Sequence, residues 1–104
     1  MPYPGSIDAM TFGQFGSIYL KTAATTITPP TSKLITAITM LEETQFSALV
    51  AKDSAQSFNT VAGGAGSDGE TLGSDQVFPR GVTIYGKWKS LSLTSGSVIA
   101  YVGV

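Results

Sequence analysis

Residues 82–102 read VTIYGKWKSLSLTSGSVIAYV, and this stretch decides the fold class. Apolar and polar residues alternate along it, which is the period of a β-strand with one buried face. The apolar face is even-numbered as far as Trp88 but odd-numbered from Leu91, so we expect a β-bulge near 89–90, where one extra residue bends the strand. A hairpin turn is predicted at 94–97. The last segment is apolar on both faces, which predicts a central strand.

The alternation also assigns the aromatic side chains of this stretch to different faces. Trp88 falls on the same face as Val82 and Ile84, so we expect it in the core, with Tyr85 pointing outward. The alternative is an exposed platform of Trp88, Tyr85 and Tyr101 that stacks on a sugar or a partner protein. The burial of Trp88 distinguishes these two arrangements.

Upstream of this stretch, the first strand is expected at 17–21, with a less clear continuation through 25–28. Threonine, isoleucine and tyrosine dominate these residues, and such side chains fit a pleated surface. Pro29 and Pro30 follow, and proline cannot donate a hydrogen bond to a neighbouring strand. The strand therefore has to end there.

A second pair of strands is expected in the middle of the chain. Residues 33–41 and 46–51 flank a polar break at 42–45, which predicts a hairpin. A helix over 34–51 is the alternative, because Leu, Met, Glu and Ala favour helices. The β-branched residues within 35–39 favour the strand interpretation.

Length and glycine content fix the domain organisation. The chain has 104 residues, enough for one domain with a single thin core. Residues 1–16 hold prolines, glycines and scattered aromatics, which predicts an extended N-terminal arm. Residues 17–104 form the β domain, with a long glycine-rich loop at 53–80. The fold class that follows is all-β: a single-domain antiparallel β-sandwich or barrel, jelly-roll-like.

The charge content points to partner proteins rather than nucleic acid or membrane. The chain is 42% hydrophobic and 12% charged, against a usual charged share of roughly 25%. We therefore expect neighbouring subunits to cover much of its surface. Six basic and seven acidic residues give a net charge of −1, and without a basic run nucleic-acid binding is not expected. No apolar run reaches the roughly 20 residues that span a bilayer. With no signal-peptide pattern, we expect synthesis in the cytoplasm.

Catalytic chemistry has few candidates in this sequence. The chain has no histidine and no cysteine, which removes Ser-His-Asp and Cys-His nucleophiles and the common zinc sites. Glu42 and Glu43 are neighbours in a predicted turn and would not share a substrate. The acidic residues of the glycine-rich loop form no EF-hand pattern, and its glycines at 63–66 lack the strand and helix of a phosphate-binding loop. We expect no enzyme activity, no metal, no cofactor and no small-molecule substrate.

The expected function is therefore binding to protein subunits. Large apolar side chains in irregular segments, together with the outward tyrosine of the C-terminal stretch, are the candidate partner contacts. These residues are Tyr3, Met10, Phe12, Phe15, Phe58, Leu72, Phe78 and Tyr85. Those within the loop could also serve as anchors that pin it to the core.

The stretch 78–101, with a Pro-x-Gly turn, an Ile-Tyr-Gly-x-Trp strand and a final Val-Ile-Ala-Tyr strand, resembles the ends of small virion proteins of tailed bacteriophages. The resemblance implies a capsid decoration (cement) protein on the outer surface of the virion. Such a protein binds the major capsid protein and itself, and we expect a homotrimer. The alternatives are a receptor-binding fibre or spike component and a carbohydrate-binding β-module.

Overall fold

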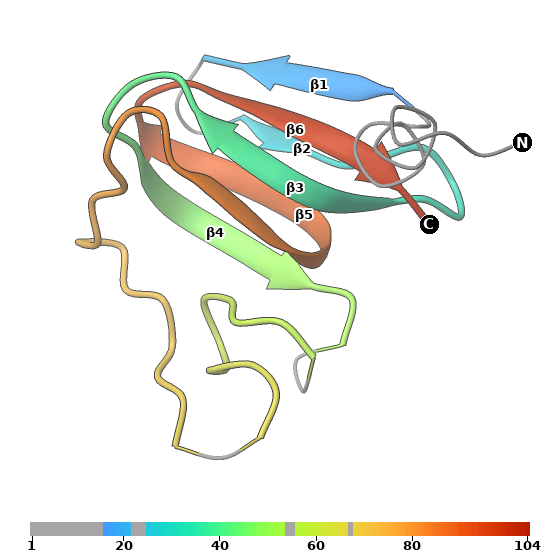
Figure 1. Cartoon of the computed structure of the whole chain (residues 1–104), viewed down its shortest axis with the longest axis vertical. Helices are drawn as coiled ribbons and strands as arrows, with labels where there is room; N and C mark the ends of the chain where they lie inside the picture. The colour runs from blue at the N-terminus through green and yellow to red at the C-terminus, as the bar shows by residue number, and fades with distance from the viewer. Residues whose placement is uncertain (1–15, 22–24, 54–55, 67) are drawn as a thin grey trace, which may run out of the picture.

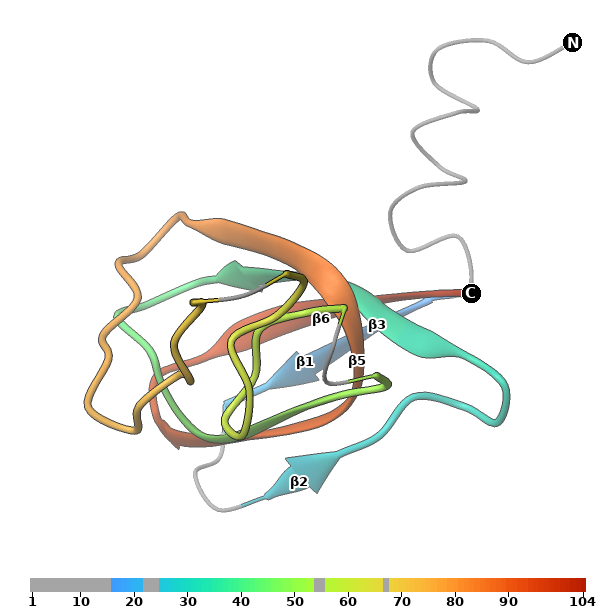
Figure 2. The ribbon, with the colours of Figure 1, turned by 90° about the horizontal axis from the view of Figure 1, so that it is seen from below.

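The computed structural model describes residues 16–21, 25–53, 56–66 and 68–104, and these form an all-β domain. Six strands make one antiparallel sheet that curls into a half-barrel (Figures 1 and 2). The strands are β1 (Ser17–Leu20), β2 (Thr26–Ile27), β3 (Leu34–Met40), β4 (Gln45–Ala51), β5 (Thr83–Ser95) and β6 (Val98–Gly103). The all-β, antiparallel prediction is confirmed, and strands replace the helix considered for 34–51. The predicted arm at 1–16 lies, except for its last residue, outside the described residues.

The sheet is built around the long strand β5. The strand order is β1-β6-β3-β5-β2, and β4 also pairs with β5. The first half of β5 pairs with β3, whereas its second half pairs with β4 and β2. Strand β6 lies between β1 and β3. The prediction that the last apolar segment forms a central strand is confirmed.

A bulge in β5 allows this change of partners. Val50 pairs with Ser90, but the next residue, Ala51, pairs with Trp88, so Lys89 is the extra residue on β5. The predicted bulge near 89–90 is confirmed. Because a bulge bends its strand and increases the local twist, one strand can follow the curl of the sheet.

Both predicted hairpins are wrong, although both turns exist. Strands β3 and β4 do not pair with each other, and neither do β5 and β6, because β3 lies between β5 and β6. The two turns instead pack together as corners of the half-barrel. The Leu41 N–H donates to the Ser97 carbonyl at 2.9 Å, and the Ser97 hydroxyl donates to the Glu42 carboxylate at 2.8 Å. The bend of β5 carries its second half away from β6, so β5 and β6 cannot continue as a ladder.

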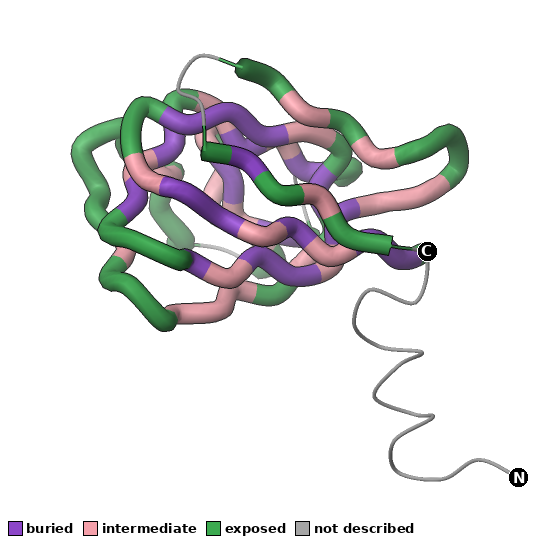
Figure 3. Tube along the Cα trace, turned by 90° about the horizontal axis from the view of Figure 1, so that it is seen from above, coloured by how far each residue is buried: buried purple, intermediate pink, exposed green. Residues whose placement is uncertain are grey.

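The core lies inside the curl, and buried residues alternate with partly buried ones along β6 and most of β3 and β4 (Figure 3). Trp88 is fully buried, which confirms its predicted core position. The core cluster consists of Leu20, Ile35, Ile38, Met40, Phe46, Leu49, Ala51, Trp88, Leu91, Leu93, Val98 and Ala100. In the described part of the chain, no helix is long and apolar enough to cross a membrane.

The long loop between β4 and β5 packs beneath one side of the half-barrel. The indole N–H of Trp88 donates to the Phe58 carbonyl at 2.9 Å, and the two rings meet edge-on. Asn59 is fully buried, and its side-chain oxygen accepts the N–H groups of Val61 and Ala62. Backbone hydrogen bonds in both directions join Thr44 and Phe78 near the loop's end. These contacts give the glycine-rich loop a defined path.

Candidate functional site

Two rows of outward-facing residues without charge run across four neighbouring strands, β1, β6, β3 and β5, and Lys87 lies just beyond them on β5. Residues directly opposite each other in an antiparallel sheet share a face, and the pairing aligns two rows across these strands. The first row is Tyr19, Ile99, Thr39 and Thr83, and the second is Ser17, Tyr101, Ala37 and Tyr85. We call these eight residues the uncharged face.

The strand period explains why these side chains point outward. Leu20 on β1 and Val102 on β6 point into the core, so Tyr19 and Tyr101, one residue away, point to the opposite side. Tyr19 and Tyr85, at opposite margins of the face, are each 61% exposed. The outward orientation predicted for Tyr85 is confirmed.

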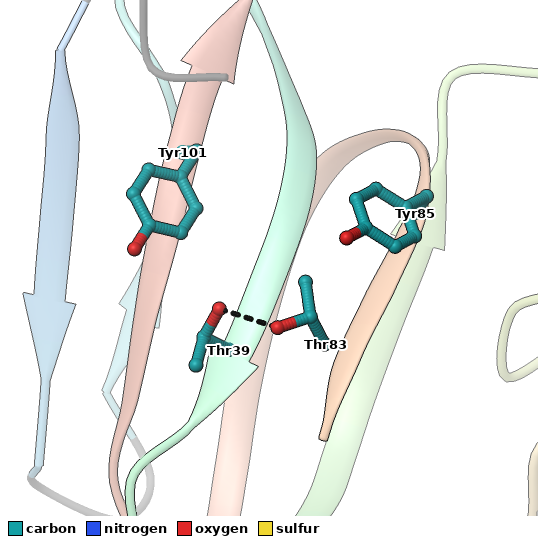
Figure 4. A pocket seen from close by; sticks show the side chains of 4 residues that line it. All are labelled: Thr39, Thr83, Tyr85 and Tyr101. Carbon is teal, nitrogen blue, oxygen red and sulfur yellow. Dashed lines mark hydrogen bonds between the residues drawn. The ribbon is translucent and has the colours of Figure 1, made fainter. Parts of the chain in front are cut away.

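A shallow hollow of about 270 Å³ lies within the uncharged face, lined by Thr39, Thr83, Tyr85 and Tyr101 (Figure 4). Ala37 on β3 pairs with Tyr85 on one side and with Tyr101 on the other. Ala37 itself is fully buried, and the residue of β3 that lines the hollow is Thr39. The hollow therefore lies between a tyrosine of β5 and a tyrosine of β6, with β3 between them.

Two hydroxyls close one end of this hollow. The Thr39 and Thr83 hydroxyls lie 2.8 Å apart and are hydrogen-bonded to each other. The lining therefore offers ring faces, methyl groups and hydroxyls, and no carboxylate or cationic group. Such a lining suits an uncharged group that packs against the rings and exchanges hydrogen bonds with the hydroxyls.

The loop residues predicted to contact a partner lie against the protein's own core. Phe58, Leu72 and Phe78 are half-buried and pack on the core cluster. Phe78 meets Phe46 edge-on, with ring centroids 5.4 Å apart. These three residues are anchors of the loop, as the alternative interpretation expected. A partner contact for them stays a prediction.

The remaining predicted residues divide between the arm and the uncharged face. Tyr3, Met10, Phe12 and Phe15 lie outside the described residues. Tyr85 lies on the uncharged face, next to the hollow.

Sequence reasoning missed Tyr19 and Ile99 as parts of this site. Alternation along each segment could place each of them opposite the core. However, bringing them into one row with Thr39 requires the strand order, which the sequence pattern does not contain.

The acidic residues considered for catalysis or metal binding are separate and exposed. Glu42 and Glu43 lie in the turn between β3 and β4, and Asp68, Glu70 and Asp75 lie along the loop. Among the described residues, no group of three or more acidic side chains lies close enough to hold a metal ion.

Comparisons with protein family models, curated proteins and solved structures give no match to this chain. The functional argument therefore rests on the geometry of the uncharged face. Tyr19 and Tyr85, the most exposed of its three tyrosines, are its most accessible aromatic side chains.

Proposed function

We propose that this chain is a non-enzymatic structural protein that binds other protein subunits through its uncharged face. In its specific form, the proposal is a decoration protein on the outer capsid surface of a tailed bacteriophage. The observation that carries the proposal is the pair of rows across four strands with no charged residue and with two tyrosines 61% exposed. The resemblance of residues 78–101 to phage virion proteins supports the specific form.

The physical basis is the low cost of removing this face from water. Charged groups lose favourable hydration when a partner covers them, whereas apolar and aromatic surface gains about 25 cal/mol per Å² buried. Tyrosine is enriched among the residues that dominate binding energy at protein interfaces. The hollow between Tyr85 and Tyr101 can receive one protruding side chain of the partner. Many copies on one shell would add their contributions through multivalency.

Co-sedimentation with emptied heads of the tailed phage that carries the gene tests this proposal. We expect the wild-type chain to pellet with the heads in high copy number. The Y85A variant is expected to bind about 30-fold more weakly, the effect of losing an interface contact worth about 2 kcal/mol. The matched control is V61A, because Val61 is 73% exposed but lies on the loop, away from the uncharged face.

Two results would count against this interpretation. A wild-type chain that stays in the supernatant at micromolar concentration excludes the decoration role. If V61A and Y85A bind equally weakly, the uncharged face is not the docking surface.

A neutral carbohydrate is the second candidate ligand, as in a receptor-binding fibre or spike component or a carbohydrate-binding module. The observation that favours it is the position of Tyr85 and Tyr101 on either side of β3, with the threonine hydroxyls at one end (Figure 4). Sugar rings stack on aromatic faces and bond to hydroxyls. On an array of neutral glycans, we expect binding by the wild type and V61A and loss of binding by Y85A. Absence of binding to every glycan would reject this candidate.

A further inference from the structure

Strand β1 forms one margin of the sheet. It pairs with β6 on one side, and among the described residues no strand pairs with its other side (Figure 1). A strand at a sheet margin presents unpaired N–H and C=O groups, and these can pair with a strand of another chain. The free margin of β1 is therefore a possible interface.

The hydrogen-bond pattern shows which residues of β1 present these groups. The Val102 N–H donates to the Gly16 carbonyl at 2.8 Å, so Gly16 and Val102 form a hydrogen-bonded pair. Such pairs alternate with non-hydrogen-bonded pairs along an antiparallel ladder. Ile18 and Leu20 therefore direct their backbone groups toward β6. Ser17, Tyr19 and, where the chain stays extended, Lys21 direct theirs toward the free margin.

The margin lacks the usual protection against pairing. Natural edge strands carry charged side chains, proline or bulges that prevent association. Residues 17–20 read SIYL, with no charge and no proline, and their pairing with β6 is regular over all four residues. The first charged residue is Lys21, one position beyond the strand.

We infer that two copies of this chain pair through β1 as an antiparallel dimer whose two-fold axis passes through Tyr19. Backbone hydrogen bonds then join Tyr19 to Tyr19 of the partner subunit, and Ser17 to Lys21 of the partner subunit. On the core side, Ile18 lies opposite Leu20 of the partner subunit. This register pairs every group that the margin offers between Ser17 and Lys21.

The pairing deepens the proposed function, on which its biological role rests. With the axis perpendicular to the sheet, the uncharged faces of both copies point the same way. The row of Tyr19, Ile99, Thr39 and Thr83 then continues across the axis into the same row of the partner subunit. One surface across eight strands would dock on the shell, with twice the contact area of a single copy.

A two-fold contact of this kind is isologous and closes with two copies. It gives a dimer in place of the homotrimer that the sequence led us to expect. The mass of the free chain, measured by light scattering coupled to size exclusion, decides between them. We expect twice the mass of the chain. A single-chain mass at tens of micromolar, or the mass of three chains, would overturn the inference.

Cross-linking tests the register independently of the phage heads. The chain has no cysteine, so Y19C and Y85C each introduce a single thiol. Both positions are 61% exposed on the same face, which makes them a matched pair. Across the proposed axis the two Cα atoms at position 19 would lie about 5.5 Å apart. With a short bismaleimide we expect Y19C to become mostly covalent dimer and Y85C to stay monomeric on a denaturing gel.

Equal cross-linking of the two variants would refute the register. Two lysine variants give the complementary test, because like charges directly opposite each other destabilise a sheet. We expect Y19K to have the mass of one chain, whereas Y85K keeps that of two. Y19K chains that remain dimeric would place the interface elsewhere. A dimer that does not bind heads would leave this inference intact and reject the proposed docking role.

Discussion

Replacing Trp88 by alanine is expected to lower the free energy of unfolding by about 3–5 kcal/mol, the range measured for truncating large buried aromatic side chains. Trp88 is fully buried, pairs with both Ile35 and Ala51, and so occupies the point where β5 changes partners. Its indole N–H also holds the Phe58 carbonyl of the loop. Since small domains are stable by only about 5–15 kcal/mol, this loss would remove a large fraction of the free energy of unfolding.

Urea unfolding followed by circular dichroism is the suitable measurement. Trp88 is the only tryptophan of the chain, so its fluorescence is lost in the variant. W88F is the matched control, because it keeps an aromatic ring but removes the indole donor. We expect it to cost less than W88A, about 1–3 kcal/mol for the loss of the bond to the Phe58 carbonyl and of volume. A loss below about 1 kcal/mol in W88A would contradict the central role of this residue.

The alternation of residues 82–93 was sufficient to predict which of their apolar side chains face the core. The change of phase between Trp88 and Leu91 placed the bulge near 89–90, because burial on one face requires a register change there, and the strand pairing identifies Lys89 as the extra residue. The outward position of Tyr85 follows from the same period. Local patterns thus determined the faces of the strands.

Strand pairing could not be predicted in the same way. The two-residue alternation shows which face of a strand is buried, but it does not show which strand lies alongside. The turns before β4 and β6 were therefore interpreted as hairpins. The bend of β5 decides which strands pair with each other, and this bend is a property of the whole sheet. The uncharged face depends on that pairing, since Tyr19 and Thr83 belong to distant segments. Buried Asn59 was also missed, because a single asparagine in a polar loop gives no distinctive signal.

The same bend links the fold to the proposed function. It leaves β1, β6, β3 and the first half of β5 as a continuous four-stranded surface, whose inner side is covered by the core cluster. The outer side has no covering element among the described residues, and the eight residues of the uncharged face carry no charge to keep them hydrated, although Lys87 follows them on the same side of β5. A monomer gains nothing from this arrangement, whereas an assembly gains the free energy of burying it.

The second large loss of stability is expected when Gly96, in the corner between β5 and β6, is replaced. Its φ is +96°, a conformation that residues with a side chain rarely adopt. A Cβ at this position would lie 2.5 Å from the Glu43 carbonyl oxygen and 2.7 Å from the Thr44 Cα. Both are backbone atoms, so the opposite corner would have to move. We expect G96A to destabilise the protein by about 2–4 kcal/mol, combining backbone strain with overpacking.

G81A separates these two causes. Gly81 has a φ of +90°, but a Cβ there would meet nothing within 4 Å. Its substitution should cost only the backbone term, about 1–2 kcal/mol. The difference between the two variants in urea unfolding then measures how tightly the corners at 41–44 and 96–97 are packed. Equal losses would mean that the corners tolerate a methyl group. In that case their contact, and with it the fixed position of β3 between β5 and β6, would contribute little to holding the half-barrel together.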